Sequence, residues 1–530
     1  MKIVQIIYRI RYAIRFYRKE KFYKLLDTRS AKAKLLLLRP ALKSGMVGDS
    51  EFRFLNESHH IELPGDWNNH KRSDLWQYNL HYHDALVSMG NERNIQRHYR
   101  LIKRWIIDNC SGRGLGWDPY PTSRRICNWI IFSQISGGLD VVSRISLAMQ
   151  ADMIMRRMEY HILGNHLIAN AKALIFSGLY FIGREAGIWL KKGCMILSKE
   201  LSEQVHPDGG HYELSPMYHS IVLMDLLDII AYFKSMDMKY PENWNIVASR
   251  MIRWQAVMTH PDGEISLFND SAFGIVPDPK SISSYAQHIG LLIEDDVQEG
   301  ITTLQDSGYI RLENVDAVLI ADVAEIGSEC QPGHGHADAL SFELSLGGRR
   351  IIVDSGISLY GRSAERLRQR GTDAHNTVSV DGNNSSEVWS GFRVARRAKI
   401  IRRDTNCENN TLVTTGIHDG FRRFPGVQLH TRTWKLYDRE LLIIDKITGS
   451  GNHDIKCGLN FHPEHTIDIY ENIARVRNIT NISIVLCDRI KWRVVPTTWH
   501  PEFGLSVPSH RLSGEAKLQL PTEWETRITW

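Results

Sequence analysis

The 530-residue chain is predicted to be a multidomain protein of helices and sheets, in which a helical half precedes an antiparallel β-sandwich. A chain of this length suits two to four domains of about 150 residues each. From about residue 75 to 295 the apolar residues recur with a helical period, and from about residue 300 onward short alternating or β-branched runs lie between turn signals. We therefore divide the chain at residues 1–60, 61–297 and 298–530.

The first segment, residues 1–60, is predicted to contain a basic amphipathic helix and a connecting stretch. It begins with MKIVQIIYRIRYAIRFYRKEKFYKLL, where arginines interrupt the apolar residues and no small-residue cleavage site of a signal peptide follows. The face expected to turn inward consists of Ile3, Ile7, Ile10, Ile14 and Tyr17. The basic face consists of Lys2, Arg9, Arg15, Arg18, Lys19, Lys21 and Lys24.

The basic face of this helix would contact either solvent or anionic lipid. We therefore expect a cytoplasmic protein, or one that is peripheral at the inner membrane through residues 1–26, with the periplasm as the alternative location. No stretch approaches the roughly 20 uninterrupted apolar residues that span a bilayer, so no transmembrane helix is expected.

Two predicted helix starts in the helical half, residues 61–297, carry groups that handle protons. In GNHLIAN, Asn165 is predicted as the N-cap with His166 in the first turn. In ELSPMYH, Ser215 is predicted to cap a helix whose first turn contains Tyr218 and His219. Ordinary capping is the alternative explanation for each of these motifs.

A third predicted helix start, WDPYPTSRRICNW, would place arginines at a helix N-terminus. Thr122 or Ser123 is the predicted cap, with Arg124 and Arg125 in the first turn. In an array of helical hairpins every second helix runs in the same direction, so the N-termini of the inner helices can gather and favour an anion. Because arginine binds carboxylate and sulfate groups bidentately, we expect an acidic ligand.

The β-rich half, residues 298–530, begins with a predicted hairpin in GHGHADALSFELSLGGRRIIVDSG, residues 333–356. Alternating apolar residues flank a Gly-Gly turn. The expected register pairs Leu346 with Arg349 and Ser341 with Asp354. Other predicted strands include ISLYG, NTVSVDG and RTWKLYDRELLIIDKI.

Histidines and carboxylates around this hairpin indicate a metal site. His336, Asp354 and His375 offer two imidazoles and one carboxylate, which suit Zn²⁺ with an open fourth position. Strict strand alternation would place His336 on the face opposite Asp354, so a shared ion requires the glycines of GHGHAD to break strand geometry. Asp338 is expected to stabilise the turn or to support a ligand.

The same region carries an excess of basic residues, which favours a polyanionic partner. Nucleic acid is the rival to an anionic polysaccharide, but no recognised nucleic-acid motif accompanies the excess, so none is expected to bind. The basic residues are Arg349, Arg350, Arg362, Arg366, Arg368, Arg370, Arg393, Arg396, Arg397, Lys399, Arg402 and Arg403.

The motifs NHLIAN, DGGHYELSPMYH, HGHADALSFELSLGGRRIIVDSG, and AHNTVSVDGNNSSEVW with the following GFR, resemble the heparinase II/III-like polysaccharide lyases in order and spacing. The resemblance extends from about residue 60 to the end. It implies an incomplete (α/α) toroid followed by an antiparallel β-sandwich, and cleavage of uronic-acid glycosides by β-elimination. A glycosaminoglycan or a bacterial exopolysaccharide would be the anionic substrate.

The resemblance also implies roles for single residues. The expected catalytic residues are Asn165, His166, Tyr218 and His334. The expected substrate-binding residues are Arg124, Arg125, His219 and Arg370. The expected metal ligands are His336, Asp354 and His375, and the ion would be Zn²⁺, with no organic cofactor.

Elimination removes the C5 proton next to a carboxylate, so the developing charge must be stabilised while a base acts. Asn165 and His166 would neutralise the carboxylate. Tyr218 would serve as acid and base, with its pKa lowered from about 10 by helix N-termini and arginines. Zinc would fix the loop that presents His334.

Other functions remain open at this point. The same scaffold could bind or assemble a glycan with little turnover, since fold alone does not establish activity. It could also catalyse C5 epimerisation of a uronate or metal-assisted hydrolysis. The basic N-terminal segment favours a role beside exopolysaccharide or lipopolysaccharide synthesis at a membrane.

Overall fold

The computed structural model describes residues 2–13, 25–109, 112–293, 297–478 and 482–530. The chain divides into two compact units. The helical unit consists of Met1–Val205, Ser220–Ile252 and Lys280–Glu294. The sheet unit consists of His206–His219, Arg253–Pro279 and Asp295–Trp530. Two stretches from the predicted helical half therefore belong to the sheet unit.

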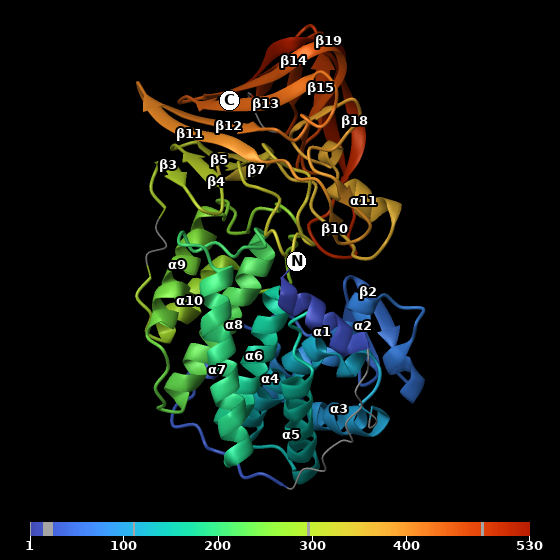
Figure 1. Cartoon of the computed structure of the whole chain (residues 1–530), viewed down its shortest axis with the longest axis vertical. Helices are drawn as coiled ribbons and strands as arrows, with labels where there is room; N and C mark the ends of the chain where they lie inside the picture. The colour runs from blue at the N-terminus through green and yellow to red at the C-terminus, as the bar shows by residue number, and fades with distance from the viewer. Residues whose placement is uncertain (1, 14–24, 110–111, 294–296, 479–481) are drawn as a thin grey trace. The chain divides into compact units, whose positions relative to one another are not determined.

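The helical unit is built around long helices, several of which run side by side (Figure 1). The α-helices before the first sandwich strand are α1 (Ile3–Ala13), α2 (Asp74–Tyr82), α3 (Ile95–Asp108), α4 (Pro119–Ser136), α5 (Val141–Arg156), α6 (Gly164–Tyr180), α7 (Arg184–Gln204), α8 (Pro216–Ser235), α9 (Asn243–Val257) and α10 (Pro279–His288). A small hairpin of β1 (Glu51–Phe54) and β2 (Glu57–His60) precedes α2. The buried core of this unit contains Trp67, Trp76, Trp105 and Trp129.

Helices α6 and α7 pack closely because each has a glycine where they meet. A Cβ atom on Gly178 of α6 would lie 2.6 Å from the backbone nitrogen of Leu190. A Cβ atom on Gly193 of α7 would lie 2.8 Å from the carbonyl oxygen of Ala171. Larger residues at these two positions would force the helices apart.

Helix α8 is long and apolar enough, by length and composition, to cross a membrane. However, 94% of its apolar window is buried inside the protein. The core helix of a soluble protein passes the same test, so this finding is weak evidence for a membrane span.

Helix α1 differs from the prediction in the face that it buries. Ile3, Ile7 and Ile10 are exposed, so their expected inward orientation is wrong. The reason is that α1 contacts the protein through Gln5, which is buried, and Tyr8, whose ring lies 4.7 Å from that of Tyr160. The predicted positions of Ile14, Tyr17 and the basic residues between Arg15 and Lys24 lie outside the described residues.

The sheet unit contains two large antiparallel sheets. The five-stranded sheet has the order β3 (Gly300–Thr303), β4 (Tyr309–Glu313), β5 (Ala317–Asp322), β6 (Phe342–Leu346) and β7 (Arg349–Ile352). The ten-stranded sheet runs in the order β11 (Ile400–Glu408), β12 (Thr411–His418), β13 (Val427–Leu436), β14 (Glu440–Asn460), β19 (Val507–Thr529), β17 (Ser483–Val485), β16 (Ile473–Val476) and β15 (Ile467–Tyr470). Strand β18 (Lys491–Trp499) pairs with β19, and β8 (Val378–Val380) pairs with β14.

One apolar core joins the two sheets. Leu319 and Phe342 of the five-stranded sheet belong to the same buried cluster as Trp434, Ile443 and Leu512 of the ten-stranded sheet. Apolar faces of two antiparallel sheets that share a core define a β-sandwich. The predicted fold class, a helical toroid followed by an antiparallel β-sandwich, is confirmed.

The predicted hairpin at residues 333–356 is confirmed at its turn and wrong beyond it. Leu346 pairs with Arg349 across the Gly-Gly turn, whose residues both have positive φ. The register then shifts by one residue, so that Leu344 pairs with Ile352. The expected pairing of Ser341 with Asp354 therefore does not form, because β7 ends at Ile352. His336 precedes β6 and Asp354 follows β7, so strand alternation does not separate them and the predicted obstacle to a shared site is removed.

Candidate active site

In the sheet unit two predicted catalytic residues, Tyr218 and His334, lie beside Tyr360, which the sequence analysis did not identify. Ser215 caps α8, as predicted, because its Oγ accepts a hydrogen bond from the backbone N–H of Tyr218 at 3.2 Å. The Tyr218 hydroxyl lies 2.8 Å from that of Tyr360. The ring of Tyr218 lies 4.0 Å from that of His334. This cap therefore positions a tyrosine directly against the predicted catalytic histidine.

Asp270 is the buried carboxylate that connects the two histidines of the GHGH motif. Its Oδ2 lies 2.8 Å from Nδ1 of His334, and its Oδ1 lies 2.9 Å from Nε2 of His336. Arg366 donates to both oxygens, at 2.5 and 2.7 Å. We call these four residues, Asp270, His334, His336 and Arg366, the Asp270 cluster.

The Asp270 cluster fixes the tautomers of both histidines. Burial alone would raise the pKa of Asp270, but Arg366 and the two histidine hydrogen bonds hold this pKa well below its usual range. An ionised carboxylate only accepts hydrogen bonds, so His334 donates from Nδ1 and His336 donates from Nε2. In the neutral form of His334 the lone pair is on Nε2, which lies 3.9 Å from Oε2 of Glu213.

Burial shifts the pKa of Tyr218 in the direction opposite to the predicted one. Its pKa is raised well above the usual value, first by desolvation and then by Tyr360 and Asp270. The expected lowering by helix N-termini and arginines is wrong, because the phenolate would be desolvated beside a carboxylate. Tyr218 is accordingly protonated near neutral pH.

Three buried side chains, one of which is His336 of the Asp270 cluster, form a candidate metal site that we call the metal trio. His336, Asp338 and His375 each offer a ligand atom, and these atoms lie within 4.8 Å of one another. Nδ1 of His336, Oδ2 of Asp338 and Nε2 of His375 are buried and have no hydrogen-bond partner among the described residues. Asp270 and Asp354 accept from the opposite nitrogens of the two histidines, so in the neutral imidazoles the lone pairs lie on the two unpaired nitrogens. This donor set fits a divalent transition-metal ion such as Zn²⁺.

The carboxylate of the metal trio differs from the predicted one. Asp354 lies next to the trio, but its Oδ2 accepts from Nδ1 of His375 at 2.7 Å and its Oδ1 accepts from the backbone N–H of Gly356 at 3.1 Å. In this geometry Asp354 orients His375, and Asp338 offers the unpaired oxygen. The sequence analysis assigned Asp354 as a ligand and Asp338 to the turn or to the support of a ligand.

Arg370 and His219 have structural contacts in the sheet unit. The Arg370 guanidinium is buried and donates to the carbonyl oxygen of Gly335, at 2.8 and 3.2 Å, between His334 and His336. His219 is buried with its ring stacked 4.2 Å from Trp254. Arg370 therefore anchors the histidine loop, and neither side chain is placed to meet a ligand from solvent.

The remaining predicted site residues lie in the helical unit. Helix α6 begins at Gly164 after Leu163, so the predicted N-cap at Asn165 is wrong; the positive φ of Leu163 starts the helix earlier. His166 contacts Glu159 through Nδ1 at 3.0 Å, and its ring lies 4.4 Å from that of Tyr120. Asn165 is buried, whereas a quarter of the His166 side chain, 26%, is exposed.

Arg124 and Arg125 have different environments on α4. This helix begins at Pro119 after Asp118, so the predicted cap at Thr122 or Ser123 is wrong: the prolines fit its first turn. Arg125 is fully buried, with its guanidinium 3.7 Å from the Trp105 ring and bonded to Gln150 at 2.9 Å. Burial lowers the pKa of Arg125 far below its usual value. Its predicted contact with substrate is not available in this structure.

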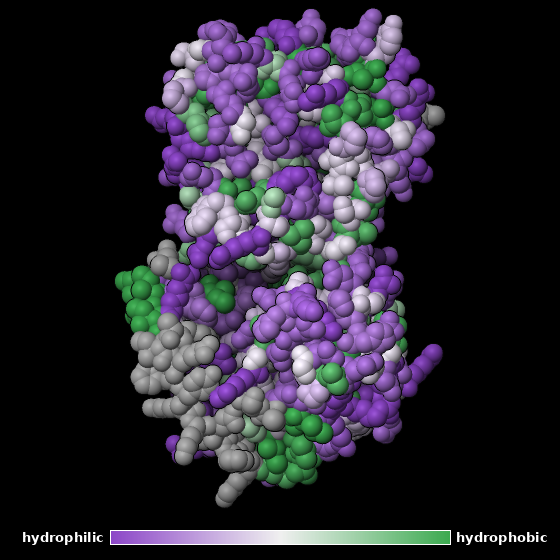
Figure 2. Space-filling model, turned by 90° about the vertical axis from the view of Figure 1, so that its right-hand side faces the viewer, coloured by the Kyte–Doolittle hydropathy of each residue, from purple (hydrophilic) through white to green (hydrophobic). Residues whose placement is uncertain are grey.

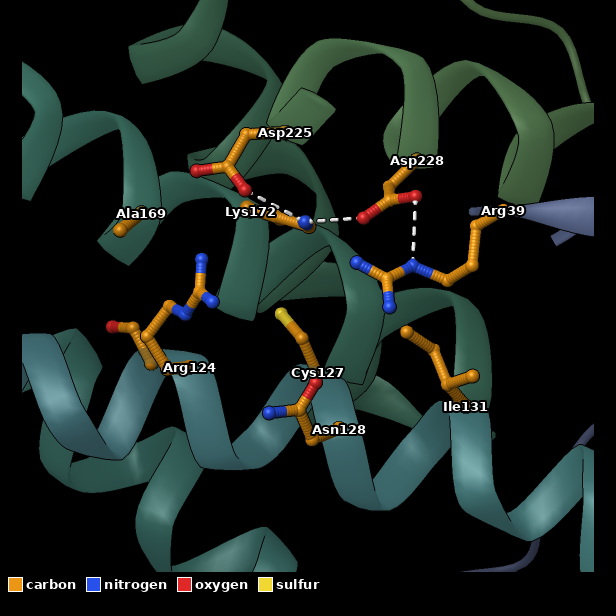
Figure 3. A pocket seen from close by; sticks show the side chains of 10 residues that line it. Arg39, Arg124, Cys127, Asn128, Ile131, Ala169, Lys172, Asp225 and Asp228 are labelled. Carbon is orange, nitrogen blue, oxygen red and sulfur yellow. Dashed lines mark hydrogen bonds and ion pairs between the residues drawn. The ribbon is translucent and has the colours of Figure 1, made fainter. Parts of the chain in front are cut away.

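Arg124 instead lines a pocket of the helical unit (Figure 3). In the same pocket Nζ of Lys172 contacts Asp225 and Asp228, each at 2.7 Å. Asp228 also pairs with Arg39 at 3.3 Å. We call Arg39, Lys172, Asp225 and Asp228 the ion cluster. Its charges balance one another. Arg124 is a further cation of the pocket and pairs with Asp84 at 3.5 Å.

The sequence missed Asp270, Arg366 and Tyr360. Asp270 lies near the end of the predicted helical half, residues 61–297, in a stretch where no catalytic motif was identified. Tyr360 belongs to ISLYG, which was predicted as a strand but is irregular, because Gly356 has positive φ and bridges to His500. Neither stretch has a spacing that indicates catalysis.

Solved structures of heparinases have the same fold as this chain. A heparinase III structure matches 99% of this chain and 88% of its own chain, with a TM-score of 0.73 at 18% identity. A heparan sulfate lyase structure from Pedobacter heparinus matches 99% of this chain and 87% of its own, with a TM-score of 0.61 at 16% identity. The protein therefore has the heparinase III fold.

The chain belongs to the heparinase II/III-like family. The family model "Heparinase II/III N-terminus" matches residues 141–287, and "Heparinase II/III-like, C-terminal" matches residues 297–523. A heparin-sulfate lyase of Bacteroides stercoris is 26% identical over 263 residues, which is 44% of this chain and 38% of that protein. A heparin-sulfate lyase of Bacteroides thetaiotaomicron is 24% identical over 370 residues, 59% of this chain and 52% of that protein. The matches thus span about half or less of these relatives' lengths.

Proposed function

We propose that this protein is a polysaccharide lyase that cleaves a uronic-acid-containing anionic polysaccharide by β-elimination. Family membership and the heparin-sulfate lyases among its relatives support this function. The observation that carries the proposal is the contact of Tyr218 with His334 and Tyr360, with His334 held by Asp270. Such a cluster provides an acid and a base side by side.

In the proposed reaction His334 is the base and Tyr218 is the acid. Nε2 of His334 removes the C5 proton, and the C–H electron pair forms the C4=C5 double bond. The C4–O4 bond breaks, and the Tyr218 hydroxyl protonates the leaving oxygen. Asp270 supports the histidine because it accepts from Nδ1–H, so that the neutral imidazole presents its lone pair at Nε2. Tyr360 orients the Tyr218 hydroxyl through their hydrogen bond.

The uronate carboxylate also needs a partner during proton removal, because negative charge develops next to it. We assign this role to Asn165 and His166 at the start of α6, where the helix dipole also favours an anion. Glu159 orients His166 through Nδ1. Arg124 is the remaining proposed contact to acidic groups of the substrate.

Zinc is a proposed component of the sheet unit. His336, Asp338 and His375 would hold the ion, with Asp270 and Asp354 orienting the two imidazoles. A bound Zn²⁺ would neutralise the buried carboxylate of Asp338 and fix the loop that carries His334. Proton transfer is assigned to Tyr218 and His334, which lie outside the trio.

Near-ultraviolet absorbance during incubation with polysaccharides tests the proposed reaction. The substrates are heparin, heparan sulfate, chondroitin, hyaluronan, alginate and bacterial uronans. Elimination creates an unsaturated uronate that absorbs in this range, so at least one substrate should give a rising signal. A polymer that binds without any signal would favour a glycan-binding or assembly protein and contradict the lyase.

Epimerisation is distinguished by isotope exchange. A C5-epimerase would introduce solvent deuterium at C5 while the chain length stays constant. A lyase shortens the polymer and yields the absorbing product. Deuterium uptake without shortening would therefore replace the proposed reaction.

A further inference from the structure

Helix α1 presents an apolar face to solvent. Most of the surface in Figure 2 is hydrophilic, with hydrophobic residues in separate patches. Four isoleucines of α1 are exposed within eight residues: Ile3 by 76%, Ile6 by 43%, Ile7 by 56% and Ile10 by 55%. Their spacing places all four on one side of the helix.

The opposite side of α1 holds it against the protein through polar and aromatic contacts. The Gln5 amide donates to the carbonyl oxygen of Ile162 at 3.4 Å, and Tyr8 packs on Tyr160. Nζ of Lys2 pairs with Glu203 of α7 at 2.5 Å. A surface helix of a globular protein normally buries its apolar side, so this orientation is reversed.

The charges of α1 indicate what covers the isoleucines. Arg9 and Arg11 are exposed, and by helical geometry they lie on either side of the isoleucine stripe. Helix α1 has no acidic residue, and the first acid of the chain is Glu20. An apolar stripe between cations matches a bilayer surface, where acyl chains lie beneath anionic headgroups.

We propose that the exposed face of α1 binds the surface of an anionic lipid bilayer. The four isoleucines lie at the acyl boundary, and Arg9 and Arg11 contact the headgroups. The helix lies in the membrane plane and keeps its contacts to Ile162 and Tyr160. This interaction is independent of the lyase proposal, because it uses none of the residues assigned to catalysis.

Sedimentation of the full chain with vesicles tests the proposal. Vesicles of phosphatidylglycerol with phosphatidylcholine should bind the protein, and phosphatidylcholine alone or high salt should weaken binding at least about tenfold. The triple variant Ile3→Ser, Ile7→Ser, Ile10→Ser should bind at least about tenfold more weakly, since each isoleucine loses its apolar contact. These side chains are exposed in the free protein, so folding should be preserved.

The matched control is the triple variant Ile107→Ser, Ile188→Ser, Ile246→Ser. These isoleucines of the helical unit are exposed by 72%, 46% and 54%, and the control should bind vesicles like the natural chain. Equal loss in both variants, or a natural chain that does not bind phosphatidylglycerol vesicles, overturns the proposal. A natural chain that dimerises in light scattering, does not bind vesicles and becomes monomeric in the α1 variant would show instead that a second copy covers this face.

Discussion

The ion cluster of the helical unit and the Asp270 cluster with its adjoining metal trio both bury charged groups, but they differ in what remains unpaired. In the ion cluster Lys172 contacts two aspartates and Asp228 contacts two cations. Burial alone would lower the pKa of Lys172, but Asp225 and Asp228 raise it, so the group stays charged. In the metal trio three polar atoms that could bind an ion have no partner among the described residues.

This difference separates a stabilising cluster from a functional one. A buried polar atom without a hydrogen bond costs about 1–3 kcal/mol. Three such atoms that converge in one place call for an explanation, and a bound ion would satisfy all three. The groups of the ion cluster therefore satisfy one another, whereas the metal trio keeps three buried polar atoms that an ion could satisfy. Substitutions can test this comparison, because some remove a paired charge and others remove a proposed catalytic group or metal ligand.

The largest expected effect is on turnover. Tyr218→Phe removes the proposed acid, so kcat should fall by about a thousandfold while substrate binding is largely kept. Tyr240→Phe is the matched control: its hydroxyl bonds to Asn245 at 3.0 Å in the helical unit, and the variant should keep full activity. Initial rates from unsaturated-product absorbance measure both. Undiminished turnover in Tyr218→Phe would remove this tyrosine from the mechanism.

A pair of aspartate substitutions compares the two clusters in stability. Asp270→Asn leaves the fully buried Arg366 without its carboxylate, so the free energy of unfolding should fall by about 3–5 kcal/mol. Asp225→Asn should cost about 1.5 kcal/mol, because Lys172 keeps its bond to Asp228. Urea denaturation followed by circular dichroism measures both variants. Equal losses would mean that the two clusters tolerate a missing charge equally well.

Metal binding should stabilise only a protein with an intact trio. At a Zn²⁺ concentration 100 times the dissociation constant, the gain in unfolding free energy is about 2.7 kcal/mol. His375→Ala should abolish this gain after chelator treatment, and His288→Ala, an exposed histidine of α10, should keep it. Thermal unfolding and metal analysis measure the effect.

The same measurement decides between the two aspartates. Asp338→Asn should abolish metal binding, whereas Asp354→Asn should weaken it about 10- to 100-fold by releasing His375. The reverse result would support Asp354 as the ligand, as the sequence predicted, and assign Asp338 the supporting role.

The sequence predicted correctly those features of the fold that depend on residue spacing within one segment. The two halves, the Ser215 cap and the Gly-Gly turn follow from spacing that a single segment contains. The Asp270 cluster joins residues 270, 334, 336 and 366, and its contacts form only after distant loops fold together. The hydrogen bonding of Asp338 and Asp354 has a similar cause, because the loops outside the strands determine that Asp354 contacts Gly356 and His375 while Asp338 Oδ2 stays unpaired among the described residues.

The smallest effect concerns acid stability and uses a paired cluster inside the sheet unit. Arg432 donates to both oxygens of Asp445, at 2.8 and 2.9 Å, and His430 contacts Oδ1 at 2.8 Å. Burial alone would raise the pKa of Asp445, but these partners lower it from 3.8 to about 2. A carboxyl group whose pKa is lower in the folded than in the unfolded state stabilises the fold at pH values above its unfolded pKa. This contribution of about 2 kcal/mol is therefore present above pH 4 and is lost as the pH falls toward 2.

Asp445→Asn should therefore reduce the unfolding free energy at pH 6 more than at pH 2.5, where the natural carboxyl is itself becoming protonated. Urea midpoints at the two pH values measure the difference between variant and natural chain. If the difference is the same at both, the charge of Asp445 does not contribute to stability. A difference that shrinks in acid would show that the sheet unit also contains a cluster like the ion cluster, in which the pairing of charges stabilises the fold.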